Sequence, residues 1–295
     1  MNPAASAAAR RYLFLTVFVA GMCTLAVEFT ASRLLQTVYG TSNIVWANVI
    51  GLVLLSLTAG YFIGGRLADR RPGAGLFYTL VSLAGFAAVF FLLLTSAILR
   101  GAAGALAVMN VGAVAGSLLM VVLALVVPVT LLGCLSPFAV RLAVRDVAEA
   151  GRVSGRIYAV STLGSLLGTY LPVLVVIPLA GSRAAAVVFG ALLLVVGLVG
   201  VWQFGRTQRG SRAALLALPA LLVPTVLFGL RGGVKSYAGQ VYETESAYNY
   251  VQVIRQDDCN YLLLNEGQAY HSFYCDGGRV PSVSVWSVML AAPYF

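Results

Sequence analysis

Long apolar runs alternate with short polar segments along the chain up to about residue 232. Each run is close to the ~20 residues that a helix needs to cross the hydrocarbon core of a bilayer. The pattern therefore predicts about seven transmembrane helices. Their expected limits are residues 12–35, 44–65, 75–99, 108–135, 157–178, 184–204 and 213–230.

The N-terminus, MNPAASAAARRYLFLTVFVAG, carries two arginines before an apolar run, as a secretory signal peptide does. However, the run continues to Leu35, and no small-residue cleavage site closes a short apolar core. We therefore expect this run to be a retained first span.

The longest apolar stretch covers residues 101–140. At 1.5 Å per residue it would extend roughly 60 Å as one helix, about twice the hydrocarbon thickness. Pro128 and Pro137 are candidate break points, because proline interrupts helical hydrogen bonding. The stretch could therefore hold a tilted, broken or doubled span.

After Lys235 the pattern changes to an alternation of apolar and polar residues. Strand-forming side chains gather in residues 248–253, 261–264 and 268–274. The sequences Asp-Asp-Cys-Asn and Asn-Glu-Gly, which lie between them, are typical of turns. We expect a small antiparallel β-unit of two or three strands, which would need a partner for stability.

The predicted fold is therefore mainly α. A polytopic membrane helical bundle of about seven spans is expected at residues 1–232, and the antiparallel β-unit follows at residues 233–295. So small a β-unit would be marginal alone, and the family resemblance given below implies that it is an incomplete domain.

Composition agrees with this interpretation. The chain is 60% hydrophobic and 10% charged, with a mean hydropathy of +0.92, whereas soluble domains are about 25% charged. The net charge of +9 would suggest nucleic-acid binding in a soluble protein, but the excess lies in short loops between apolar runs. We expect the lipid bilayer, and no nucleic acid, as partner. The predicted location is multi-pass in a bacterial plasma membrane.

The basic residues also predict an orientation, because cytoplasmic loops are enriched in arginine and lysine. With the N-terminus inside, the inner flanks hold Arg10, Arg11, Arg66, Arg70, Arg71, Arg141, Arg145, Arg152, Arg156, Arg206, Arg209 and Arg212. The outer flanks hold only Arg33, Arg100, Arg183, Arg231 and Lys235. The N-terminus is therefore expected inside, and seven spans would put the β-unit outside.

Two charged residues lie within the first predicted span, Glu28 and Arg33. An ionisable side chain at membrane depth is costly unless it faces protein or water, so Glu28 is a functional candidate. One interpretation is a polar clamp to Asn43 or Asn48 of the next span. The other is a role in binding a substrate.

The loop after the second span, GGRLADRRP, places Asp69 among three arginines. It resembles the loop of major facilitator transporters in which an acid and arginines bridge neighbouring helix ends. It could equally be an ordinary basic inner loop with one neutralising acid. Together with Glu28, it gives an alternative function: a transporter-like module for a small cationic solute such as a polyamine. We find no internal repeat, which many transporters have.

The sequence STLGSLLGT places Gly164 and Gly168 four residues apart in a predicted span. This spacing lets two helices approach closely in lipid. A phosphate-binding loop would need a preceding strand, which the flanking sequence lacks. Close helix packing is the favoured interpretation.

Of the four cysteines, Cys23 and Cys134 lie in spans, where they are expected to be inert. Cys259 and Cys275 bracket a hairpin-sized segment of the β-unit. They could form a disulfide if this unit is outside the cytosol, and would be free thiols if it is inside. The single histidine, His271, has no neighbours at metal-ligand spacing, so no metal site is predicted.

The β-unit resembles a known domain. The pattern E-S-x-Y-x-x-V-x-V from Glu245, followed by YLLLNEGQ, is similar to the N-terminal β-domain of the spermidine synthase (polyamine aminopropyltransferase) family. An apolar half before it is similar to the membrane-fused members of this family. The matching membrane segments are VEFTASRLL, GYFIGGRLADRRP and GRVSGRIYAVSTLGSLLGTYLPVLVVIPLAG.

The resemblance implies aminopropyl transfer from decarboxylated S-adenosylmethionine to a polyamine. In the family, a Rossmann-like domain follows the β-domain and supplies a glycine-rich loop for this co-substrate and a catalytic aspartate. We find no such loop after Lys235. We therefore expect the catalytic domain to be missing from this chain, and we assign no catalytic residues. The expected protein partner is a separate catalytic domain or a second copy of the chain in a homo-oligomer.

The resemblance also implies that Asn249, Gln268 and Tyr270 line a substrate site. The chain departs from the family in having Trp286-Ser287-Val288 where Tyr-His-Glu is usual, which weakens the prediction of polyamine specificity. The two lines of argument also disagree on the side of the membrane on which the β-unit lies. The co-substrate is made in the cytosol, whereas the arginine distribution predicts that the β-unit is outside.

Overall fold

A computed structural model describes residues 3–108, 113–204, 209–235, 237–267 and 269–276. The helical part contains seven α-helices: α1 (Pro3–Tyr39), α2 (Asn43–Arg70), α3 (Ala74–Val108), α4 (Ala113–Ala143), α5 (Ala150–Leu171), α6 (Ile177–Phe204) and α7 (Arg209–Gly229). A 3-10 turn (Val147–Glu149) precedes α5, and a π-helical turn (Pro172–Val176) follows it.

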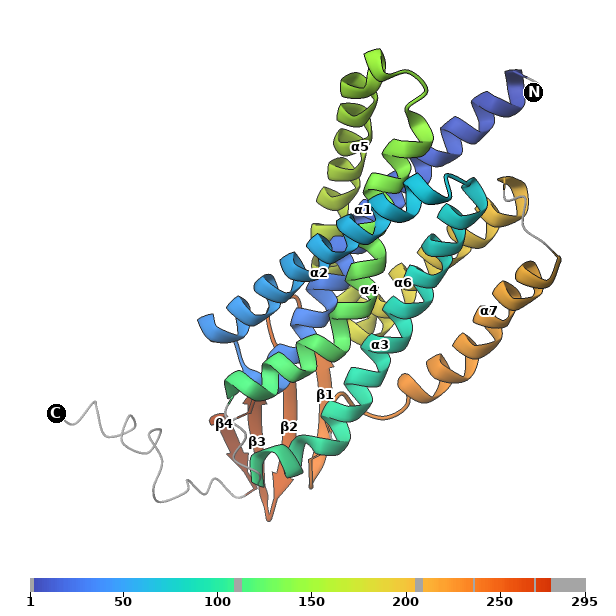
Figure 1. Cartoon of the computed structure of the whole chain (residues 1–295). Coiled ribbons are helices and arrows are strands. Elements are labelled where there is room, and N and C mark those ends of the chain that lie inside the picture. The colour runs from blue at the N-terminus through green and yellow to red at the C-terminus, as the bar shows by residue number, and fades with distance from the viewer. Residues whose placement is uncertain (1–2, 109–112, 205–208, 236, 268, 277–295) are drawn as a thin grey trace.

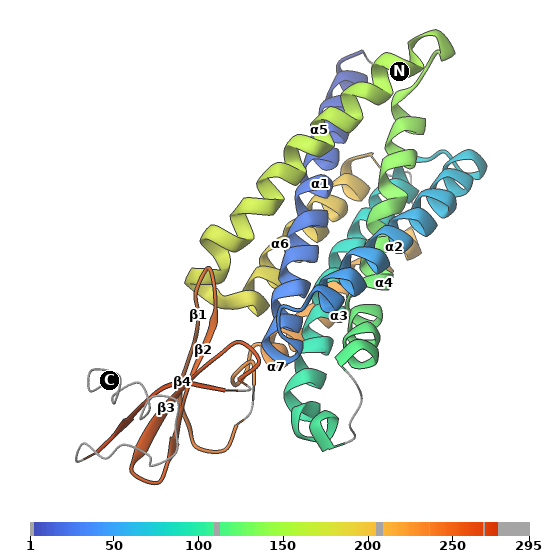
Figure 2. The same cartoon turned by 90° about the vertical axis from the view of Figure 1, so that its left-hand side faces the viewer.

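Successive helices run in alternate directions along the bundle, and the strands lie at the end opposite the N-terminus (Figures 1 and 2). In the described part of the chain, five segments are long and apolar enough to cross a membrane. The last, Val147–Phe204, contains both α5 and α6, and α7 contributes only the shorter apolar segment Ala217–Gly229. The membrane character of the bundle is thus supported, whereas the count of seven spans stays a prediction.

The long apolar stretch at 101–140 is shared by two helices. Helix α3 continues to Val108, and α4 begins at Ala113. Pro128 and Pro137 both lie inside α4, so the proposed breaks at the prolines are wrong. Helices packed in a bundle tolerate proline because neighbouring groups satisfy the hydrogen bond that it removes.

Helices α1 and α5 pack backbone to backbone through glycine. A side chain at Gly164 would collide with the carbonyl oxygen of Phe18, and one at Gly168 with that of Met22. Gly21 of α1 similarly faces Ser161 of α5. This geometry confirms the close-packing interpretation of the Gly164 and Gly168 spacing.

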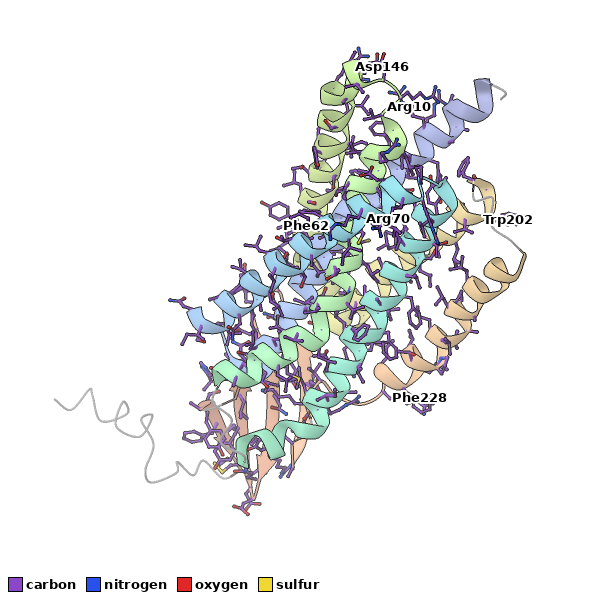
Figure 3. All side chains as sticks on the ribbon, in the orientation of Figure 1. Arg10, Phe62, Arg70, Asp146, Trp202 and Phe228 are labelled. Atoms are coloured by element: carbon purple, nitrogen blue, oxygen red, sulfur yellow. A yellow bond between two sulfur atoms is a disulfide. The ribbon has the colours of Figure 1, made fainter. Side chains whose placement is uncertain are left out.

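Side chains divide clearly between the bundle interior and its outer surface. The interior contains fully buried aromatic and aliphatic residues such as Phe77, Phe138 and Leu125. Large apolar side chains such as Phe62 and Leu163 are exposed on the outer faces of α2 and α5 (Figure 3). Apolar side chains on the outside of a bundle are expected where lipid, and not water, is the surrounding solvent.

The β-unit is a four-stranded antiparallel sheet in the order β1-β2-β3-β4. The strands are β1 (Gln240–Glu245), β2 (Tyr250–Gln256), β3 (Cys259–Leu264) and β4 (Tyr270–Cys275). The described residues form four strands where two or three are predicted, because β1 was missed. Asp257 and Asn265 take positive φ values of 53° and 51° in the tight turns, as turn-forming residues tolerate.

Cys259 and Cys275 are direct partners across β3 and β4. The structure joins them in a disulfide that spans 16 residues of sequence. Cys23 and Cys134 are free and buried in the bundle. The bridge closes the end of the hairpin distant from the loop between β1 and β2.

Candidate functional site: the junction between the bundle and the sheet

The sheet meets the bundle near the ends of α1, α6 and α7 (Figure 2). Polar side chains gather at this junction. Arg33, near the end of α1, donates from its two terminal nitrogens to the carbonyl oxygens of Tyr248 and Ser246, at 2.6 and 2.7 Å. Both carbonyls belong to the loop between β1 and β2. A planar guanidinium with two bonds fixes direction as well as distance, so Arg33 holds this loop against α1.

Glu245, the last residue of β1, binds the start of α6. Its carboxylate accepts hydrogen bonds from the backbone nitrogen of Ser182 at 2.5 Å and from the Ser182 hydroxyl at 2.6 Å. The first N–H groups of a helix lack partners within the helix and favour a negative charge. A strand side chain therefore caps the regular part of α6.

Gly181 makes this cap possible. It takes φ 83° and ψ 165°, outside the helical region, where the chain turns into α6. A side chain here would be strained and would lie 2.7 Å from a carboxylate oxygen of Glu245. Only glycine lets the strand carboxylate approach the helix end so closely.

Arg183 binds the other side of the junction, at the end of α7. Its guanidinium donates to the carbonyl oxygens of Gly229 at 3.1 Å, Arg231 at 3.3 Å and Gly232 at 2.6 Å. Arg100 of α3 donates to the same Arg231 carbonyl. The last carbonyls of a helix lack partners within it and favour cations, so these arginines anchor the segment that leads from α7 to the sheet.

The segment before β1 is fixed by Glu243 and Lys235. Glu243 accepts hydrogen bonds from the backbone nitrogen of Val234 at 2.5 Å and from the Gln240 amide at 2.7 Å. Lys235 is 8% exposed, and its ammonium donates to the carbonyl oxygen of Asn265 at 2.6 Å. The ammonium also lies 5.4 Å from the centre of the Tyr250 ring.

Burial dominates the electrostatics of this group. It lowers the pKa of Lys235 to about 8, against the opposing attraction of Glu266 and Glu243. Burial, and then the neighbouring Glu243, raises the pKa of the Tyr250 hydroxyl. Lys235 is therefore the group at the junction that is expected to change charge in the mildly alkaline range.

A pH dependence of stability follows. The folded pKa of Lys235 lies below its ordinary value of 10.5, so above pH ~8 the unfolded chain binds more protons than the folded chain. Stability contributed by this residue should therefore rise between pH ~8 and ~10.5 and stay constant below that range. Thermal denaturation would measure the Tm of the wild type and of Lys235→Met across this range. The Tm of the wild type should rise relative to that of Lys235→Met as the pH increases. A difference that does not depend on pH would contradict this.

Two cavities border the junction. One, of 540 Å³, lies between the start of α6, the segment after α7 and β1, and its polar lining includes Arg183, Glu243 and Glu245. The other, of 330 Å³, lies between α1, the start of α2 and the loop between β1 and β2, and it includes Arg33 and Trp46. The charged groups around them already bind protein atoms, so the geometry points to a structural junction rather than to an acid–base pair.

Comparison with protein-family models, with curated proteins and with solved structures finds no match for this chain. Membership of the spermidine synthase family therefore stays a prediction from the quoted motifs.

Of the three predicted substrate-lining residues, the two that the structure describes, Asn249 and Tyr270, make separate contacts at opposite ends of β2. Asn249, just before β2, accepts a hydrogen bond from the Asn265 amide at 2.9 Å. The Tyr270 hydroxyl donates to Gln256, at the opposite end of β2, at 3.4 Å, and the Tyr270 ring packs on Tyr261 with 4.5 Å between ring centres. Gln268 lies outside the described residues. Asn249 and Tyr270 thus support the sheet, and their role in binding a substrate stays a prediction.

Glu28 lies half-buried on α1, and no hydrogen bond or ion pair joins it to a residue in the described ranges. Asn48, one of its proposed partners, donates to Ser117 of α4 at 3.0 Å. The transporter hypothesis for Glu28 stays a prediction. Asp69, at the end of α2, lies 3.4 Å from the Arg141 side chain of α4. An acid and an arginine thus bridge two helix ends there, although both are exposed and such pairs contribute little stability.

The sequence contains a signal for the junction that its analysis did not use. The basic residues of the outer flanks, Arg33, Arg100, Arg183, Arg231 and Lys235, all lie at this end of the bundle. The acids of the following segment, Glu243 and Glu245, lie beside them. Opposite charge on the outer loops and on the tail indicates that the two would meet, but not which residues would pair.

Proposed function

We propose that the chain is the membrane anchor and N-terminal β-domain of a spermidine-synthase-like aminopropyltransferase, with the sheet held at the non-cytosolic end of the bundle. The observation that carries this proposal is the junction, in which Arg33 of α1 and Ser182 of α6 bind the sheet, and Arg183 of α6 binds the segment that leads from α7 to it. Nothing in such a junction is needed merely to span a membrane. The junction holds the sheet in one fixed orientation relative to the bilayer.

The family motifs supply the chemistry of the proposal. In aminopropyl transfer, an amine nitrogen attacks the aminopropyl carbon bound to the sulfonium of decarboxylated S-adenosylmethionine. The carbon–sulfur bond breaks, 5′-methylthioadenosine leaves as a thioether, and the new ammonium loses one proton to a base. The family assigns the donor-binding loop and this base to the Rossmann-like domain, so the described residues take the role of anchoring and positioning.

Two observations support the proposal of a multi-pass protein in a plasma membrane with the sheet outside. The arginine-rich end of the bundle and the sheet lie at opposite ends (Figure 1). A disulfide in the sheet agrees with an oxidising compartment. The proposal therefore places transfer on the outer side, where it would act on externally available amines and donor.

Oriented membrane vesicles test this proposal directly. Right-side-out and inverted vesicles containing the protein in its natural reading frame would receive labelled decarboxylated S-adenosylmethionine and putrescine. We expect labelled spermidine in right-side-out vesicles only. Absence of transfer in both orientations, with putrescine, spermidine or cadaverine as acceptor, would reject aminopropyl transfer. Transfer in inverted vesicles only would retain the reaction and reject the outer placement.

A further inference from the structure

A third cavity, of 200 Å³, lies at the end of the bundle opposite the sheet. Ends of α1, α3, α4, α5 and α6 surround it. Its apolar walls include Leu13, Tyr78, Leu142, Val153 and Phe204, and its charged residues are Arg10, Arg145 and Glu149. Figure 3 shows Arg10 and the neighbouring Asp146 at this end. No residue of the junction described above contributes to it.

Among the residues that the structure describes, the two arginines of this cavity have no protein partner. Arg10 and Arg145 are exposed, and neither makes a hydrogen bond or ion pair with a residue in the described ranges. Glu149, in contrast, is bound by Arg152, and the Asp146 carboxylate accepts from the backbone nitrogen of Ala148 at 3.0 Å. The nearby acids are therefore engaged, and two unpaired guanidiniums remain.

Two aromatic rings line the cavity, those of Tyr78 and Phe204. Tyr12, which does not line it, packs against both rings. The ring centres of Tyr12 and Tyr78 lie 5.6 Å apart, and those of Tyr12 and Phe204 lie 5.3 Å apart. The Tyr12 hydroxyl is satisfied by the carbonyl oxygen of Val196, at 2.7 Å. Apart from the Tyr78 hydroxyl and the charged residues, the lining side chains are apolar. A ligand that fills the cavity would therefore be mainly apolar there and anionic at the arginines.

We propose that this cavity binds a phosphate-bearing amphiphile, with its phosphate between Arg10 and Arg145 and the adjoining apolar part against Leu13, Val153 and Phe204. Guanidinium groups match phosphate oxygens with paired hydrogen bonds. Helix α3 begins at Ala74 on the cavity wall, and its N-terminal dipole adds to the attraction for an anion. An anionic phospholipid of the inner leaflet has this chemistry, and a free phosphate shares its headgroup.

Lipid binding to the purified full chain in neutral detergent tests the site. Native mass spectrometry would measure retention of phosphatidylglycerol, phosphatidylcholine and inorganic phosphate. The double variant R10Q/R145Q removes the proposed headgroup contacts. Arg70→Gln is the matched control, because Arg70 is an exposed arginine on the inner flank that does not line the cavity. Ala143→Leu adds volume at the cavity wall without changing charge.

We expect phosphatidylglycerol to bind more tightly than phosphatidylcholine. R10Q/R145Q should weaken its affinity about tenfold, the effect of losing roughly 1.4 kcal/mol of charge-assisted bonding, whereas Arg70→Gln should change it less than about twofold. Ala143→Leu should weaken the affinity for phosphatidylglycerol but not the affinity for inorganic phosphate. Equal effects of R10Q/R145Q and Arg70→Gln would overturn the site, because they would indicate general attraction to a basic surface. An unchanged phosphatidylglycerol affinity in Ala143→Leu, in protein that keeps its Cys259–Cys275 disulfide, would overturn the amphiphile and leave phosphate as the ligand.

Discussion

In intact cells, a membrane-impermeant maleimide should label the protein only after an impermeant reductant has opened the disulfide between Cys259 and Cys275. The two sulfurs are bonded in the structure, so neither can react before reduction. The sheet that carries them lies at the end of the bundle opposite the N-terminus (Figure 2). The excess of arginine in the predicted inner flanks predicts that this opposite end is outside.

The other two cysteines should not contribute to the labelling. Cys23 and Cys134 are buried in the bundle, at 0% and 2% exposure, and should give no background. The double variant with serine at Cys259 and Cys275 should lose all label and serves as the control. Labelling that requires a permeabilised membrane would contradict the outer placement and would put the sheet in the cytosol. Labelling without reductant would contradict the disulfide.

The helices could be predicted from the sequence because membrane spans are defined by length and apolar composition alone. Their ends could not, since a helix ends where its backbone is interrupted and not where its apolar run ends. The run expected at 44–65 continues as helix to Arg70, and the chain leaves the helix before Pro72 and Gly73. The glycine pair at 164 and 168 was readable because close packing depends on local spacing.

Strand β1 shows where local preference misleads. Its sequence, QVYETE, contains two glutamates, a residue type that is depleted in strands. Both are needed for contacts outside the strand: Glu243 binds Val234, and Glu245 binds Ser182 of α6. The tertiary contacts of the two glutamates at the junction therefore outweigh the low strand propensity of this residue type. These contacts are visible only in the folded structure.

The pairing at the junction is not readable from sequence for a related reason. Arg33 and the Tyr248 carbonyl that it binds are 215 residues apart, and the acceptor is a backbone group that every residue carries. The opposite charges of the outer flanks and of the following segment could have indicated which end of the bundle and which segment attract each other. Geometry was needed to show that most of the bonds run from arginine to backbone carbonyls and not to Glu243 or Glu245.

Replacing Arg183 with alanine should loosen the sheet from the bundle and lower the stability of the whole protein. The substitution leaves the carbonyls of Gly229, Arg231 and Gly232 without their shared donor. Hydrogen bonds to a charged group contribute about 1.5–3 kcal/mol each, and they do not add fully when one side chain makes several. We therefore expect a loss of about 3 kcal/mol, or a fall in Tm of roughly 6–12 °C for a chain of this size.

Arg231→Ala is the matched control, because it removes the same charge at the same junction, from the segment after α7 that Arg183 of α6 binds. The exposed Arg231 side chain lies 5.3 Å from the centre of the Phe228 ring, and a surface substitution of this kind usually changes stability by less than about 0.5 kcal/mol. Thermal denaturation in detergent would give the two Tm values, and hydrogen exchange would show whether amides from Leu230 to Glu245 lose protection first. Equal Tm values for the two variants would contradict the anchoring role of Arg183. Loss of protection across α6 without any change in that segment would assign the role of Arg183 to the bundle alone, and the sheet would then be held by Arg33 and Glu245.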